Sequence, residues 1–176
     1  MPFELRPYPM ETLSPTSGYI QESWQNSVKP LSVRFAVKMK LPAIDPLPHT
    51  HLAHEGFQYA KEQNKANEYV DAVFNAYWQD GLDIGKVDIL ADIAEKVVLN
   101  KAEFKEALGS RKYEQAHKQE LKHAYEEARI SGVPTFFIGS KRLQGLNSKE
   151  VLEKAILEQT ESGESSSGES SEVDGC

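Results

Sequence analysis

The sequence predicts an α/β protein that is mostly helical by residue count. Between residues 50 and 130, apolar side chains recur at helical spacing in several successive stretches. A short apolar and aromatic run at 133–138 then follows Gly132 directly, and such a run is typical of a buried strand. A polar break and one more helical pattern follow it, so we expect a strand, a hairpin and a closing helix after a helical region.

Composition and charge narrow the class of protein. The chain has 176 residues, 39% of them hydrophobic and 27% charged, which is typical of a globular domain. The net charge is −7, but the tail from residue 161 onward carries acidic residues without Lys or Arg, so the rest is nearly balanced. We therefore expect no nucleic-acid partner and no membrane partner. Without a signal-peptide pattern or a membrane-length apolar run, the expected localisation is cytoplasmic.

The first fifty residues predict a strand, a short helix and a connector. Residues 3–5 alternate like a strand before prolines interrupt the pattern. Ile20, Trp24 and Val28 then form one helical stripe, which the Lys29-Pro30 pair is expected to end. Residues 31–37 are expected to add a turn or two of helix, and the proline-rich segment 40–48 is expected to be extended.

Three histidines, His49, His51 and His54, raise the question of a metal site. On a helix beginning at residue 50, His51 and His54 would share one face as a pair of ligands. The alternative is a helix start that Thr50 caps, with the histidines at the surface or at its boundary. We favour the helix start and assign no metal ligand.

Helical patterns fill the region from 50 to 130. Phe74, Tyr77 and Trp78 form an aromatic stripe, for which we favour core packing over a ligand groove. Asn100 with Glu103 forms a capping-box pattern. A long polar helix is expected to run from residue 110 to 129, and its histidines receive no role. The inward positions expected on that helix are Tyr113, His117, Leu121, Ala124 and Ala128.

The C-terminal elements are a hairpin, a helix and a tail. Residues 136–138 are predicted to form a strand buried on both faces, and 143–144 to pair with it. Asn147 is expected to cap the last helix through an Asn-x-x-Glu pattern. Residues 159–176 are rich in Ser, Gly and Glu, and we expect this tail to be disordered.

The order of proline-headed strand, hairpin and closing helix resembles the C-terminal half of a thioredoxin fold. The sequences PFELRPYP at 2–9, AYWQDGLDI at 76–84 and GVPTFFIG at 132–139 resemble the DsbA/FrnE-like thioredoxin-superfamily family. That family includes 2-hydroxychromene-2-carboxylate isomerase-like and kappa-type glutathione transferase branches. The resemblance covers residues 3 to about 157.

The resemblance implies a division into domains. A thioredoxin-like domain would comprise residues 1–49 and 131–158, an inserted helical subdomain residues 50–130, and the acidic tail residues 159–176. The first strand and the first helix of the family would precede residue 2, where this sequence has only Met1. We expect a truncated chain rather than an evolved pseudoenzyme.

The resemblance also implies a binding site at Val133, Pro134 and Thr135. In the family the corresponding Val-Pro bond is cis, and the main-chain polar groups before the proline face the active site. There they hold an extended protein dithiol or disulfide substrate, or glutathione. From the residues alone, a trans proline heading a strand is the alternative.

The sequence has no Cys-x-x-Cys, and the thiolate that exchange requires is not evident. Its one cysteine, Cys176, lies in the acidic tail, where nothing would lower its pKa. We therefore expect a thiol-disulfide oxidoreductase family protein that has little activity as written, with no catalytic residue, cofactor or metal assigned. The alternatives are a non-catalytic glutathione- or peptide-binding module, or a fragment of a glutathione-dependent isomerase.

A missing first strand would also leave unpaired strand edges in the sheet. A strand exchanged with a second copy would fill such a gap, so a homodimer belongs to the expected partners.

Overall fold

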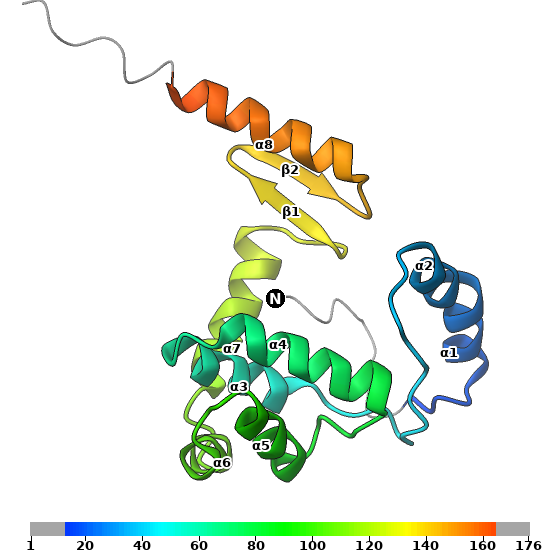
Figure 1. The fold of residues 1–176 in the computed structure, drawn as a ribbon, viewed down its shortest axis with the longest axis vertical. Helices are drawn as coiled ribbons and strands as arrows, with labels where there is room; N and C mark the ends of the chain where they lie inside the picture. The colour runs from blue at the N-terminus through cyan, green and yellow to red at the C-terminus, as the bar shows by residue number, and fades with distance from the viewer. Residues whose placement is uncertain (1–12, 165–176) are drawn as a thin grey trace, which may run out of the picture. The chain divides into compact units, whose positions relative to one another are not determined.

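A computed structural model describes residues 13–164, and these residues form helices and one two-stranded sheet (Figure 1). By internal contacts they divide into a helical unit, residues 13–123, and a hairpin unit, residues 124–164. The predicted strand at 3–5 lies outside the described residues. The expected domain boundaries at 49 and 130 differ from this division and stay a prediction of the family resemblance. None of the described helices is long and apolar enough to cross a membrane.

The helical unit begins with a helix that passes through the predicted stop. Helix α1 (Gly18–Ser23), the π-helical turn η2 (Trp24–Val28) and α2 (Lys29–Arg34) follow one another without a break. The expected end at Lys29-Pro30 is therefore wrong. In the π turn the amide of Lys29 donates to the carbonyl of Trp24, and Pro30, which has no N–H, falls in the first turn of α2, where a proline is tolerated.

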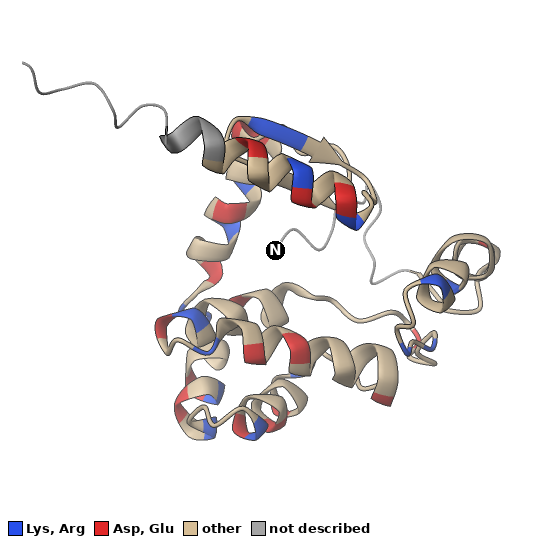
Figure 2. Ribbon diagram, turned by 45° about the horizontal axis from the view of Figure 1, so that its top comes forward, with Lys and Arg blue, Asp and Glu red and all other residues tan. Residues whose placement is uncertain are grey.

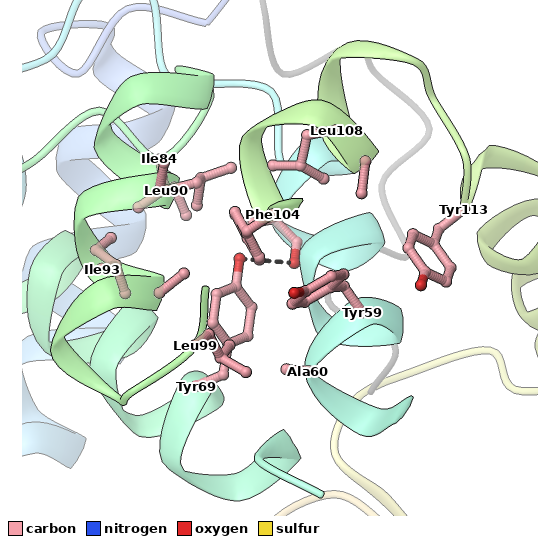
Figure 3. Close-up of a cluster of buried hydrophobic side chains, with 14 of the residues drawn as sticks. Tyr59, Ala60, Tyr69, Ile84, Leu90, Ile93, Leu99, Phe104, Leu108 and Tyr113 are labelled. Atoms are coloured by element: carbon pink, nitrogen blue, oxygen red, sulfur yellow. Dashed lines mark hydrogen bonds between the residues drawn. The ribbon is translucent and has the colours of Figure 1, made fainter. Parts of the chain in front are cut away.

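The remaining helices of this unit build its hydrophobic core. Tyr69, Phe104 and Leu90 are almost completely buried, and the Tyr59 ring meets the Phe104 ring edge-on with centroids 5.3 Å apart (Figure 3). Tyr69 also donates its hydroxyl to the Ala53 carbonyl at 3.3 Å, which satisfies its buried polar atom. The elements are α3 (His51–Glu62), α4 (Ala66–Asn75), η3 (Ala76–Asp80), α5 (Val87–Lys96), α6 (Lys101–Gly109), α7 (Glu114–Lys122) and η4 (His123–Glu127).

Helix ends agree with the sequence at one position and differ at two. The Asn100 side chain accepts from the amides of Ala102 and Glu103, so the predicted cap is confirmed, while the Glu103 carboxylate accepts from the Asn100 side-chain nitrogen at 2.8 Å rather than from its backbone amide. Thr50 precedes α3 but makes no capping hydrogen bond, because its backbone is helical rather than extended. The predicted long helix from 110 to 129 is confirmed over 114–127, but its start is wrong: α6 ends at Gly109 and α7 begins at Glu114, with Arg111 at a φ of 55° between them.

The hairpin unit consists of β1 (Thr135–Ile138), β2 (Lys141–Gln144) and α8 (Lys149–Glu164). The strands are antiparallel, with Thr135 opposite Gln144 and Ile138 opposite Lys141. The prediction of a strand buried on both faces is wrong, because Phe137 is 53% exposed. Helix α8 packs against β1, and in a pleated strand Phe137 points to the face opposite that of Phe136 and Ile138, which are half-buried.

The last helix differs from the prediction at both ends. Ser148, rather than Asn147, caps α8 by accepting from the Val151 amide at 3.4 Å. Asn147 instead donates to the Gly145 carbonyl at 2.9 Å. The helix continues to Glu164, so the expected disorder is wrong for 159–164, while 165–176 lie outside the described residues. Acidic and basic residues are interspersed along α8 (Figure 2).

Candidate functional site

The peptide bond between Val133 and Pro134 is cis, as the family resemblance implied. The bond lies just before β1, and hydrogen bonds fix the chain on both sides of it. The Pro134 carbonyl accepts from the Gly145 amide at 2.8 Å, which ties the loop to the end of β2. The Thr135 hydroxyl donates to the Gly132 carbonyl at 2.7 Å, so this side chain closes the loop on itself.

Side chains of β2 hold the segment that enters this loop. The Arg142 guanidinium donates to the Arg129 carbonyl at 2.7 Å, and the Gln144 amide group donates to the Ser131 hydroxyl at 3.3 Å. A Cβ at Gly132 would lie 2.8 Å from the Gln144 amide nitrogen, so a glycine leaves room for this contact. The β1–β2 hairpin therefore holds the loop in place through these hydrogen bonds.

Val133 lies at the exposed apex of the loop. Its side chain is 49% exposed. Within residues 13–164, neither its amide nor its carbonyl has a hydrogen-bond partner. A main-chain donor and acceptor on one residue can pair with an extended ligand as another strand would. This is the arrangement expected for the predicted site at Val133, Pro134 and Thr135.

A histidine cluster in the helical unit was not predicted. His51 Nδ1 lies 3.1 Å from His117 Nε2, and the rings of His54 and His117 stack with centroids 5.0 Å apart. His117 was expected to be a lone histidine, and that expectation is wrong. The two segments are 66 residues apart in sequence, so no local pattern could connect them.

Burial keeps two members of this cluster neutral. Burial, with the neighbouring His117 as the second cause, lowers the pKa of His54 to about 3. Burial likewise lowers the pKa of His117, with His51 contributing. Among the described residues, no group of three or more His, Cys, Asp or Glu side chains is arranged to hold a metal ion.

A buried ion pair lies beside the histidines on α3. The Glu55 carboxylate is completely buried, and its Oε1 accepts from Arg111 Nη2 at 2.6 Å while its Oε2 accepts from Nε at 3.1 Å. Such a bidentate arrangement satisfies both oxygens of the carboxylate. The pair joins α3 to the segment between α6 and α7, which gives it a structural role.

The aromatic stripe of η3 and α4 has two uses. Tyr77 packs against the hydrophobic core, as predicted. Phe74 and Trp78 instead line a pocket of about 470 Å³, so the expectation of core packing is wrong for these two rings. The sequence offered the aromatic spacing but did not show which rings faced the core.

A cis proline followed by a hairpin and a closing helix is the arrangement that the resemblance to a thioredoxin fold implied. The family model of the DSBA-like thioredoxin domain matches residues 2–157, and the chain belongs to this family. The family was thus recognisable from sequence motifs.

Curated relatives fall into two groups. The chain is 46% identical over 160 residues to the uncharacterized protein YwbO of Bacillus subtilis (strain 168), covering 90% of this chain and 80% of that protein. It is 28% identical over 124 residues to a 2-hydroxychromene-2-carboxylate isomerase of Pseudomonas putida, covering 70% of this chain. The alignment spans 61% of the isomerase's length.

Among solved structures, a 2-hydroxychromene-2-carboxylate isomerase is similar with a TM-score of 0.68. The match covers 84% of this chain and 70% of the isomerase chain, at 23% sequence identity. At this identity the likeness shows the fold.

Proposed function

We propose that the Val133–Pro134–Thr135 loop binds the extended backbone of a thiol compound, either glutathione or a cysteine-containing protein segment. The observation that carries the proposal is the exposed main chain of Val133 beside the cis bond. The ligand would accept a hydrogen bond from the Val133 amide and donate one to its carbonyl, as an added strand does. Membership of the DSBA-like family supports thiol chemistry as the setting.

We further propose that this polypeptide catalyses little or no disulfide exchange. Exchange requires a thiolate that attacks a disulfide sulfur, forms a mixed disulfide and releases the other sulfur as a thiol. The sequence has no Cys-x-x-Cys, and its one cysteine is Cys176. We therefore assign binding, and not exchange, to the loop.

A titration with S-methylglutathione tests the binding, because this analogue has no free thiol and reports contact without chemistry. We expect saturable binding at millimolar concentrations in isothermal calorimetry. Val133→Ala keeps the main-chain donor and should bind as the wild type does. Val133→Pro removes the N–H and should weaken binding about tenfold, the equivalent of one hydrogen bond. Equal affinities in these two variants would show that the amide of residue 133 does not bind the ligand, which contradicts the proposed binding loop.

Insulin reduction by dithiothreitol tests the second part. We expect the rate to be the same with and without the chain. A large acceleration by the chain would show that it supplies a reactive thiol, and the proposal of binding without exchange would have to be abandoned.

A second candidate is a role in glutathione-dependent isomerisation. The likeness to 2-hydroxychromene-2-carboxylate isomerases in sequence and in fold favours it. In this candidate the contribution of the Val133–Pro134–Thr135 loop would again be to hold glutathione. Conversion of 2-hydroxychromene-2-carboxylate, followed by absorbance with and without glutathione, separates this candidate from simple binding.

A further inference from the structure

The pocket of the helical unit has no role in the function proposed above. It measures about 470 Å³ and lies between the connector that follows α2 and the α4–η3 helix. A volume in this range suits a small organic ligand. Its lining residues are Val37, Lys38, Met39, Asp71, Phe74, Asn75, Trp78 and Gln79.

A hydrogen bond from the connector and an aromatic stack hold the walls of this pocket in place. The Lys40 amide donates to the Trp78 carbonyl at 2.8 Å, which fixes the connector along the end of η3. The Trp78 ring stacks on Trp24 of η2 with centroids 6.2 Å apart and planes 10° from parallel. Gly81, at a φ of 71°, ends the helix just after this contact. The hydrogen bond therefore fixes the backbone of Trp78, and the stack on Trp24 orients its ring.

The apolar part of the lining suits an aromatic ring. Phe74 and Trp78 come from the same helix at four-residue spacing, so their rings lie on one face. Val37 and Met39 come from the connector. Aromatic rings and a thioether together form good contacts with a flat apolar group.

The polar part of the lining carries two opposite charges. Lys38 and Asp71 both line the pocket, and within residues 13–164 neither side chain makes an ion pair or a hydrogen bond. Their charges are therefore available to a ligand. Gln79 donates to the Asn75 side-chain oxygen at 2.6 Å, which orients both amide groups and leaves the Asn75 amide nitrogen as a donor.

We propose that this pocket binds a small aromatic zwitterion, with the chemistry of an aromatic α-amino acid. The ring would lie against Phe74 and Trp78, the carboxylate near Lys38, and the ammonium group near Asp71. A site that offers both a positive and a negative side chain beside an apolar surface gives selectivity against compounds that carry only one charge.

Fluorescence of Trp78 provides the test. The chain has two tryptophans, so Trp24→Phe leaves Trp78 as the single reporter and keeps a ring beside it. The probes are L-phenylalanine, phenylacetate without the ammonium group, and phenethylamine without the carboxylate. We expect saturable quenching with L-phenylalanine, and affinities at least threefold weaker for each of the two analogues.

Two variants assign the charges. Lys38→Met should weaken L-phenylalanine and phenylacetate about threefold to fivefold and leave phenethylamine unchanged. Asp71→Asn should weaken L-phenylalanine and phenethylamine about threefold to fivefold and leave phenylacetate unchanged. Lys96→Met is the matched control, since Lys96 is an exposed residue of α5 that does not line the pocket. It should change nothing.

Three results would overturn the proposal. The first is the absence of saturable quenching by any of the probes at millimolar concentration. The second is phenylacetate or phenethylamine binding as tightly as L-phenylalanine. The third is Lys96→Met acting like Lys38→Met. Because the reporter Trp78 and the two substituted residues lie in the helical unit and line the pocket, these results do not depend on glutathione binding at Val133 in the hairpin unit.

Discussion

The helical unit and the hairpin unit of this chain differ in how much they bury. The helical unit places Tyr69, Phe104 and Leu90 out of contact with solvent, whereas the buried hydrophobic residue of the hairpin unit is Ala155 among the described side chains. Several large apolar side chains of the hairpin unit are instead 44–60% exposed. They are Val133, Phe137, Leu146, Val151, Ile156 and Leu157.

This contrast separates stability from binding. Buried apolar area is the dominant stabilising contribution in a small fold, so the free energy of unfolding should reside mainly in the helical unit. The loop with the exposed main chain lies in the hairpin unit, where few contacts would have to be broken for a ligand to approach. Substitutions of the same type in the two units should therefore have unequal effects.

The largest difference is expected between two phenylalanines. Phe104→Ala should lower the free energy of unfolding by about 3–5 kcal/mol, because it removes a fully buried ring from the core. Phe137→Ala should lower it by less than about 1 kcal/mol, because that ring is already half in solvent. Urea denaturation followed by circular dichroism measures both. Equal losses would contradict the contrast between the units.

The next effect concerns the buried ion pair. Arg111→Met should cost about 3 kcal/mol, since it leaves the Glu55 carboxylate buried without a partner. Glu55→Gln should cost less, because the Arg111 side chain is 45% exposed and water can solvate it. Lys105→Met, which breaks an exposed pair with Asp88, is the control and should have little effect. A larger loss for Glu55→Gln than for Arg111→Met would be the opposite of what burial predicts.

Acidification should destabilise the helical unit through its histidines. The pKa of His54 is about 3 in the folded chain, whereas an exposed histidine, as in the unfolded chain, has a pKa of 6.5. The unfolded state therefore binds more protons between these values, and stability is complete above pH 6.5 and falls as the pH decreases. Between about pH 7 and pH 5 the loss from this one group is about 2 kcal/mol.

The groups around His54 include charges of both signs, and their contributions must be separated from its own. His51 and His117 act on His54 directly, and His117 in turn faces Glu55, Arg111 and Glu120. His54→Gln should flatten the decrease of the denaturation midpoint below pH 6.5. His123→Gln, a histidine outside this cluster, is the control. An unchanged pH profile in His54→Gln would exclude this histidine as the cause.

The smallest expected effect concerns two asparagines. Asn100→Ala removes a cap that accepts two amide hydrogen bonds, and should cost about 1 kcal/mol. Asn147→Ala should cost less, because Ser148 caps α8 and Asn147 bonds only to the Gly145 carbonyl. Thermal denaturation compares the two. A greater loss of stability for Asn147→Ala than for Asn100→Ala would contradict this assignment and favour Asn147 as the cap of α8.

Local sequence patterns predicted features that depend on neighbouring residues. Confirmed features are the Asn100 cap, the β1–β2 hairpin and the inward positions Tyr113 and His117. Sequence shows them because periodicity and capping chemistry act over a few residues. The cis bond at Val133 was expected from the family motif, since a proline alone leaves both isomers open.

Features that depend on distant residues were missed. The continuous helix through Pro30 depends on a π turn that no propensity indicates. The contact between His51 and His117 arises from the packing of α3 on α7. The pocket beside Trp78 exists because the connector is hydrogen-bonded to the end of η3, a tertiary contact that the aromatic spacing does not encode.

An amide NMR titration with S-methylglutathione tests the proposed binding loop most directly. The account predicts that the signals of Val133 and Thr135 shift progressively and saturate, while those of Leu90 and Phe104 in the helical core stay in place. Core signals that shift while Val133 remains unchanged at millimolar ligand would place glutathione elsewhere and contradict the account.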